Sequence, residues 1–449
     1  MTDIGENHIG TRFRLFPQAP FLHPGRAPET IIVAALSGPI GPGPSDQWMY
    51  LIDPVGKHTP YGVQPGQSFQ PEIDLPPWPG HIYRPIQPDK DGHFDHIPVD
   101  APEFQRAHVF GSVRFVLDIW ERYLGHRIEW HFERDIDRLE ISMLPSLDNA
   151  HVGYGFMEVG AAHLANGAVE PFALNFDVIA HELGHLILYS VVGVPNPEVE
   201  TSEYLGFQEA AADMTALISV LNFPSMIDDL LEQTCGNLYT FNELTRFSEL
   251  SVSTQIRLAA NSVKLSAFVA GWDDEHELSQ PLTGALFDVF VDVFQELLVE
   301  RGLIGASIAG LARGITRHPE HEADIQAAFA AAYSKARNGF RAALAEARDY
   351  LGQAFAETWK RLSPQYLDYA DVADALLAVD RSMSGGRFRR AIVESFQWRE
   401  IGEVRVGPRL SPPDERSHAF SARTLRPEHR CGLQHMSSRA SGKRAGRTG

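Results

Sequence analysis

Cysteine is scarce in this chain, which has only Cys235 and Cys431 among its 449 residues. They lie far apart, and the second falls in a Ser-, Gly- and Arg-rich end whose composition predicts disorder. Proteins that depend on a disulfide framework have several cysteines at short spacings. We therefore exclude such a framework.

Long apolar runs are also missing. The N-terminus, MTDIGENHIGTRFRLFPQAP, has no apolar stretch after a basic start. No later segment reaches the roughly 18 uncharged apolar residues of a membrane span. We expect a cytoplasmic protein that does not contact membranes, with non-classical export as the alternative.

Positive charge is in short supply, because 39 Lys and Arg face 58 Asp and Glu, for a net charge of -19. From Arg416 onward, basic residues outnumber acids eight to one, so the preceding body carries about -26. Such a surface repels nucleic acid and anionic membranes, and its simplest consequence is solubility. The basic end could contact an anionic partner, but its composition favours a disordered tail.

The chain is longer than a usual single domain, and its 44% hydrophobic content is enough for two packed lobes. Residues 1–100 are crowded with Pro and Gly between short apolar runs such as TIIVAAL and WMYLID, which predicts short strands and long turns. The other expected units are an α/β lobe at 101–220, a helical lobe at 221–405 and a basic disordered tail at 406–449.

Apolar periodicity predicts the main elements. FQRAHVFGSVRFVLDIWERYLG, within 102–131, has helical spacing, RLEISML alternates like a strand, and DNAHVGYGFMEVG reads as a Gly-punctuated strand or hairpin. Two further helices are expected at about 176–192 and 207–220. The rest of the chain shows apolar helical stripes up to the tail. The expected fold class is α+β.

The motif HELGH, inside LNFDVIAHELGHLILYS, places His181, Glu182 and His185 close together. Side chains four residues apart share one helix face, so His181 and His185 can bind one cation, with Glu182 beside that face. A bare HExxH string is weak evidence, because two helical histidines are often ordinary surface residues. Here, however, the apolar neighbours predict a buried helix. Its polar groups need partners, and a dication with its water supplies them.

A catalytic zinc ion usually has three protein ligands and one open position, so one more ligand is required. The third histidine of metzincins is absent, because position 191 is Val191. Glu209 follows the loop VGVPNPEVETSEY, inside GFQEAAADMTALI, a second amphipathic segment that can cross the first antiparallel. We therefore predict His181, His185 and Glu209 as the metal ligands.

Asp213 lies one turn beyond Glu209 on the same face. Metal-bound imidazoles generally donate their remaining N–H to a carboxylate, which fixes the tautomer, and Asp213 is placed to accept it from His181. The alternative is an ordinary solvated face. Three consecutive alanines with nearby Leu and Ile favour close helix packing instead.

These features resemble the gluzincin peptidases, specifically the thermolysin and fungalysin families. The resemblance is carried by NFDVIAHELGH, by the Glu and Asp of FQEAAAD, by DNAHVGYGFMEVG and by the ending YADVADALLAVDRSMSGGRFRRAIVESFQWREIG, and it covers about residues 105–402. It implies a two-lobed α+β fold. The N-terminal lobe would hold a mixed sheet with helices, the C-terminal lobe would be mainly helical, and the zinc site would lie in the cleft between them.

The resemblance also implies a histidine of the helical lobe that stabilises the transition state. The best local match is His276 in DDEHELSQPLTGALFD, where Asp273 or Asp274 could orient the imidazole. His318 and His321 are rivals, although they lack a following helix start. An ordinary surface histidine is the alternative.

Two further roles follow from the same resemblance. Asn149 and Ala150 match the edge strand that runs beside the substrate. Tyr204 would be a second oxyanion donor, although its distance from Glu209 departs from the family pattern.

Three departures limit what the resemblance implies. The linker between His185 and Glu209 is longer than in thermolysin. The calcium-binding acids expected after the glutamate ligand are not evident, although Asp177 persists, and no secretion signal is evident. Calcium dependence and extracellular digestion therefore do not carry over.

We expect a zinc-dependent endopeptidase that cleaves a peptide or protein substrate, with Glu182 as general base toward a zinc-activated water. One alternative is a catalytically silent, zinc-stabilised binding or scaffold protein, suggested by the long N-terminal region. The other is a gluzincin aminopeptidase. That enzyme needs an acidic anchor for a free amine, and GYGFMEVG only faintly resembles the required strand. The sequence carries no signal for an oligomeric state.

Overall fold

The structure is a computed structural model, and it describes a part of the chain that is mixed α+β, with small sheets and long helices. The described residues are 10–21, 25–34, 39–64, 72–164, 167–239, 246–247, 257–258, 260–314 and 319–410.

The helices of the described residues follow the predicted order and dominate the second half of the chain. They are α1 (Pro102–Leu124), α2 (Phe176–Val191), α3 (Ser202–Val220), α4 (Pro224–Thr234), α5 (Glu275–Glu300), α6 (Ala306–Arg313), α7 (Glu322–Trp359), α8 (Tyr369–Ser384) and α9 (Arg389–Trp398).

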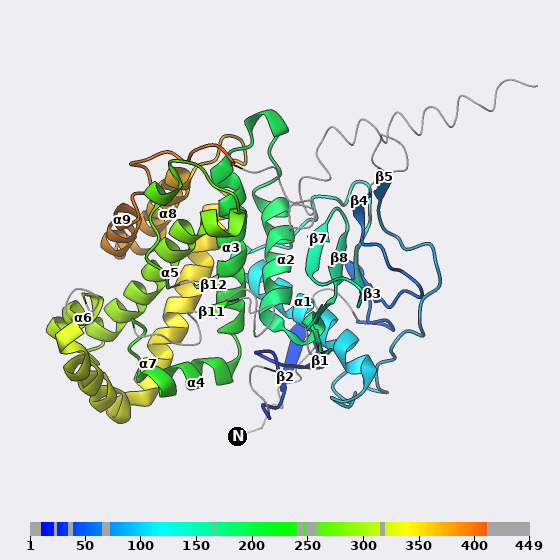
Figure 1. Cartoon of the computed structure of the whole chain (residues 1–449). Coiled ribbons are helices and arrows are strands. Elements are labelled where there is room, and N and C mark those ends of the chain that lie inside the picture. The colour runs from blue at the N-terminus through cyan, green and yellow to red at the C-terminus, as the bar shows by residue number, and fades with distance from the viewer. Residues whose placement is uncertain are drawn as a thin grey trace, which may run out of the picture.

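The strands lie mainly before α2. They are β1 (Gly10–Leu15), β2 (Glu29–Ala34), β3 (Met49–Ile52), β4 (Gly62–Gln64), β5 (Glu72–Asp74), β6 (Leu139–Met143), β7 (Ala150–Gly153), β8 (Phe156–Val159), β9 (Ala161–His163), β10 (Val169–Pro171), β11 (Arg246–Phe247) and β12 (Arg257–Leu258). In Figure 1, β3, β7 and β8 lie on one side of α2, and α3, α5 and α8 lie on the other.

Local capping chemistry sets the helix ends that periodicity left uncertain. α1 ends at Leu124 because Gly125 takes the left-handed conformation (φ 75°) and donates its N–H to the Glu121 carbonyl. α3 begins five residues before the predicted start, because the Thr201 side chain accepts the backbone N–H of Tyr204. The predicted helix at 207–220 is therefore confirmed and extended.

The largest sheet among the described residues has the strand order β3-β6-β8-β7. β3 runs parallel to β6 and β6 parallel to β8, whereas β7 and β8 form an antiparallel pair. The predicted hairpin in DNAHVGYGFMEVG is thus confirmed. It leaves β7 at the edge of the sheet, where it packs against α2.

The described residues before Ala101 belong to the same core as those that follow. β3 lies inside the large sheet, and β1 packs on α1 so closely that a Cβ on Gly111 would lie 2.8 Å from the Phe13 ring. The Phe16 backbone N–H also donates to Nε2 of His108, at 2.9 Å. The change of composition near residue 100 is therefore not a boundary in the packing.

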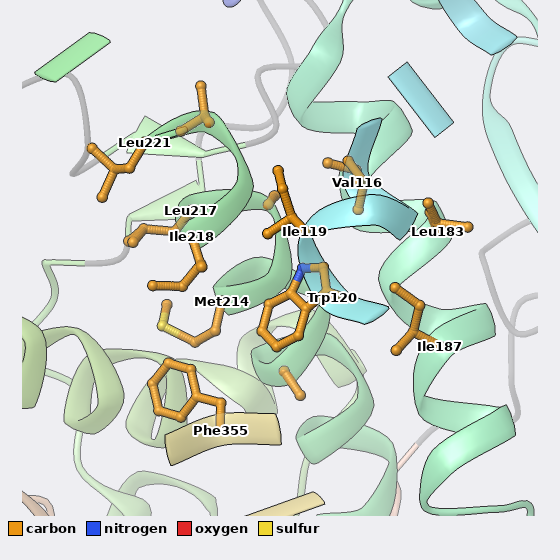
Figure 2. Packing of buried hydrophobic residues seen from close by; sticks show 14 of the residues in the cluster. Val116, Ile119, Trp120, Leu183, Ile187, Met214, Leu217, Ile218, Leu221 and Phe355 are labelled. Carbon is orange, nitrogen blue, oxygen red and sulfur yellow. The ribbon is translucent and has the colours of Figure 1, made fainter. Parts of the chain in front are cut away.

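The core is continuous from the sheet into the helices. Figure 2 shows Trp120 of α1 between Leu183 and Ile187 of α2 on one side and Met214 of α3 on the other. The Trp120 ring also stacks on Trp359 of α7, with 4.5 Å between centroids. Burial of such large apolar side chains is the main term that stabilises this arrangement.

A second feature of the sheet is a buried ionic network. The Glu158 carboxylate contacts Nζ of Lys57 at 2.9 Å and Nε2 of His151 at 2.7 Å, and it accepts the Tyr61 backbone N–H at 2.7 Å. The Tyr61 hydroxyl donates to Glu140, at 2.6 Å. Burial by itself would raise the pKa of Glu158, but the His151 hydrogen bond and the Lys57 charge hold that pKa below its usual value.

Two further observations concern membranes and the tail. No single described helix has the length and apolar composition of a membrane span, and α3 with α4 reaches them only as a pair bent by 95°. Within the predicted tail at 406–449, the Gly407 N–H donates to the Phe268 carbonyl, at 2.8 Å. Residues 411–449 lie outside the described residues.

Candidate metal centre

Helix α2 presents His181 and His185 on one buried face. Asn175 caps this helix by accepting the backbone N–H groups of Asp177 and Val178, at 3.1 and 3.3 Å. The side chains of His181 and His185 are 3% and 5% exposed. Their Nε2 atoms lie 3.1 Å apart, as the four-residue spacing predicts.

Helix α3 brings Glu209 to the two imidazoles. Its Oε2 lies 3.4 Å from Nε2 of His181, and its Oε1 lies 3.6 Å from Nε2 of His185. Among the described residues these three side chains form the one group of at least three His, Cys, Asp or Glu that could hold a metal ion. The three predicted ligands therefore lie together.

A glycine permits this close approach. A Cβ on Gly184, in the middle of HELGH, would lie 2.9 Å from the Cα of Ala212 and 3.1 Å from the Cβ of Thr215. Any larger residue would push α2 away from α3. The alanine run had indicated close packing, whereas the part that Gly184 plays in it was missed. A glycine that faces an alanine run was the available signal.

The donor atoms fit a tetrahedral divalent ion. Ligands about 2.1 Å from such an ion lie about 3.4 Å from one another. The three separations here are 3.1, 3.4 and 3.6 Å. Two imidazole nitrogens with one carboxylate suit a transition metal better than calcium or magnesium, which prefer all-oxygen sites. The residues present therefore fit a metal ion.

Asp213 supports the first histidine from behind. Its Oδ1 lies 3.0 Å from Nδ1 of His181, and its side chain is almost fully buried. An Nδ1–H donated to this carboxylate directs the lone pair of the His181 Nε2 toward Glu209 and His185. Asp213 therefore lies where the sequence predicted it.

Glu182 lies in α2 between the two histidines and is buried. Its role as general base stays a prediction.

His276, 67 positions after Glu209, also reaches the cluster. Its Nδ1 lies 3.4 Å from Oε2 of Glu209 and 3.7 Å from Oδ1 of Asp274. Asp274 also caps α5 by accepting the His276 backbone N–H, at 2.7 Å. Asp273 is exposed. Of the two candidate acids, Asp274 therefore lies beside the imidazole.

The rival histidines are placed differently. His321 is exposed and lies 3.9 Å from Glu320, and His318 lies outside the described residues.

The Tyr204 hydroxyl is engaged elsewhere. It donates to the Gly193 carbonyl and accepts from Nε2 of Gln208, both at 2.9 Å. Burial raises the pKa of this phenol well above its ordinary value. Because its proton is already donated to Gly193, this arrangement does not favour the predicted oxyanion role of Tyr204.

Asn149 and Ala150 lie at the start of β7. The Asn149 side-chain oxygen accepts the Ala150 N–H at 2.8 Å, and its backbone carbonyl accepts the Gly160 N–H at 3.0 Å. β7 packs against the helix that carries both histidines. The predicted substrate edge therefore borders the metal-ligand helix.

Comparisons with known proteins give little further information. No protein-family model matches the chain, and no curated protein matches it. Among solved structures, the chain is similar to the precursor of protealysin, a metalloproteinase from Serratia proteamaculans. The match has a TM-score of 0.46 and 11% sequence identity, over 79% of this chain and 87% of that one. At this TM-score the likeness assigns neither fold nor function.

Proposed function

We propose that the chain is a zinc-dependent endopeptidase of the gluzincin type. The convergence of His181, His185 and Glu209 at tetrahedral distances carries the proposal. Zinc is the ion that two histidines and one glutamate most commonly bind in hydrolytic sites. Once bound, it supplies a Lewis acid that lowers the pKa of a coordinated water toward neutrality.

The chain's own residues divide the remaining work. Glu182 takes a proton from the attacking water and returns it to the leaving nitrogen. Asp213 holds His181 in the required tautomer. His276, whose Nδ1 lies 3.4 Å from Oε2 of Glu209, would donate to the carbonyl oxygen as that oxygen gains negative charge.

The substrate would lie extended between β7 and the start of α5. An edge strand offers main-chain hydrogen bonds that do not depend on side-chain identity. In the proposed two-lobed arrangement, the scissile carbonyl would lie in a cleft between the sheet lobe and the helical lobe. Broad sequence tolerance is the expected consequence.

The test combines metal analysis with peptide digestion by the full-length chain. We expect about one zinc ion per chain and cleavage that stops on chelation and returns with added zinc. An N-acetylated peptide library separates the alternatives, because an aminopeptidase cannot attack blocked N-termini. Bound zinc without any turnover would favour the binding or scaffold protein. Deleting residues 1–100 is not a suitable test, because it removes β3 from the sheet.

The substitution Glu182→Gln tests the proposed general base. We expect it to keep zinc and to lower turnover by roughly 10³-fold, the upper range for a lost general base. Glu198→Gln, at an exposed glutamate, is the control and should leave turnover unchanged. Unchanged turnover in Glu182→Gln would rule out the assigned role.

A further inference from the structure

The last described residues run beside the loop that precedes α5. The Leu410 N–H donates to the Trp272 carbonyl at 2.8 Å, and the Trp272 N–H donates to the Pro408 carbonyl at 3.4 Å. Gly407 approaches the same loop so closely that a Cβ there would lie 2.5 Å from the Val269 carbonyl oxygen. This backbone pairing holds residues 407–410 against the loop.

The Arg409 side chain adds a second set of contacts. Its Nη2 lies 3.1 Å from Oε2 of Glu275, and its guanidinium lies over the Trp272 ring, 4.7 Å from the centroid. Both members of the ion pair are mostly buried. Removing one partner of such a pair leaves the other charge poorly solvated, so the contact is costly to break.

Trp272 connects this arrangement to the helix that carries Glu209. The ring is buried, and its Nε1–H donates to Oγ of Ser202, the first residue of α3, at 3.1 Å. The loop is thus held by Arg409 on one side and by α3 on the other.

His276 lies in the helical turn that follows this loop. α5 contains Pro281, which cannot donate a backbone N–H to the Glu277 carbonyl, so the first turn is less self-supporting than an ordinary one. Asp274 caps the turn, and Nδ1 of His276 lies 3.4 Å from Glu209. Contacts from outside α5 therefore influence the position of the His276 imidazole more than they would in a helix without Pro281.

We propose that Arg409 is a positioning residue that holds His276 in place through Trp272 and Glu275. This inference rests on the proposed function, because His276 matters only if it acts on a bound substrate.

The test compares Arg409→Ala with Arg390→Ala in the full-length chain. Arg390 pairs with Glu394 at 2.7 Å but is 72% exposed, which makes it a matched control. We expect Arg409→Ala to lower kcat by roughly 10- to 100-fold, the loss caused by a misplaced catalytic group. KM and zinc content should stay unchanged. Arg390→Ala should match the wild-type protein in all three.

Repeating the Arg409→Ala substitution in a His276→Ala variant distinguishes a positioning role from general destabilisation of the protein. In His276→Ala, adding Arg409→Ala should lower kcat no further, because the group being positioned is gone. An equal loss in both backgrounds would overturn the inference.

Amide hydrogen exchange supplies a readout that does not need activity. Peptides that cover residues 272–280 should exchange faster in Arg409→Ala and at the wild-type rate in Arg390→Ala. Wild-type exchange in Arg409→Ala would also overturn the inference. Failure of the proposed function is distinct, because it is seen as absent chelator-sensitive cleavage by the unmodified chain.

Discussion

Two buried glutamates of this protein, Glu158 in the sheet and Glu209 in α3, lie in opposite kinds of surroundings. Glu158 contacts an ammonium, an imidazole and a backbone N–H, which satisfy its charge within the protein. Glu209 contacts the imidazoles of His181, His185 and His276. Two imidazoles and a carboxylate whose donor atoms converge on one point form a set of metal ligands, whereas a carboxylate beside an ammonium forms an ion pair. Burial and charge by themselves therefore do not distinguish a metal site from a structural network; the chemical identity and arrangement of the partners do.

The largest expected effect separates the two glutamates by metal content. Glu209→Gln should reduce bound zinc from about one ion per chain to near none and abolish chelator-sensitive cleavage, because an amide is a poor ligand. Glu158→Gln should keep its zinc. Metal analysis after dialysis measures both, and zinc retained by the Glu209 variant would remove the basis of the comparison.

The second effect concerns stability, and here Glu158 is the glutamate whose substitution should matter. Glu158→Gln should lower the free energy of unfolding by about 3–5 kcal/mol, because it leaves the Lys57 ammonium buried beside a neutral amide. Urea unfolding of the metal-free protein measures it. The double variant Lys57→Met/Glu158→Gln should recover part of the loss, since both charges are then gone. A double variant less stable than Glu158→Gln would contradict this account.

A smaller effect on zinc affinity is expected from Asp213, which contacts the metal ligand His181. Asp213→Asn should weaken zinc binding by roughly 10- to 100-fold, or about 1.4–2.7 kcal/mol, because the amide no longer fixes the His181 tautomer as firmly. Competition with a chelator of known affinity measures the change. The control is Asp228→Asn, at a half-exposed residue that pairs with Arg341. Equal affinities in the two variants would exclude the proposed role of Asp213.

The smallest effect concerns Glu203, a third glutamate, which differs from both Glu158 and Glu209 in its surroundings. Burial and the nearby Asp368 and Asp371 raise its pKa to about 7, although its carboxylate accepts the Tyr369 N–H at 2.6 Å. The folded protein therefore binds this proton more tightly than the unfolded chain does. Stability should fall as pH rises from about 4.5 through 7, the window between the unfolded and folded pKa values.

Glu203→Gln should remove this dependence. We expect the variant to be more stable than the wild-type protein at pH 8 by about 1–2 kcal/mol, a figure reduced for the partial exposure of the side chain. Parallel thermal unfolding at pH 5 and pH 8 measures it. The same change in stability between pH 5 and pH 8 in the wild-type protein and in Glu203→Gln would show that the pKa of Glu203 is ordinary.

Much of the candidate site could be predicted because it depends on helical repeats. His181 and His185 share one face of α2 because residues four positions apart in a helix always do. Glu209 and Asp213 share one face of α3 for the same reason. Tyr204 illustrates the limit, since its hydroxyl points to Gly193, a contact that no local pattern contains.

For the fold too, local elements could be predicted from the sequence, whereas long-range pairing could not. Periodicity located α1, α2 and β6, because their apolar residues recur at the helix or strand repeat. The place of β3 in the sheet was not predictable in the same way. Each of its residues pairs with a residue of β6 that lies 90 positions later, and a Pro/Gly-rich neighbourhood gives no sign of a distant partner.

By itself, the amino-acid sequence determined which side chains are chemically able to bind a metal and which of them share a helix face, because both depend on residue type and local backbone geometry. Only the tertiary structure decided how close α2 and α3 approach at Gly184, that His276 reaches Glu209, and that Arg409 contacts the loop before α5. These contacts join segments tens to hundreds of residues apart. Their distances depend on how the whole core packs, and no local repeat encodes that.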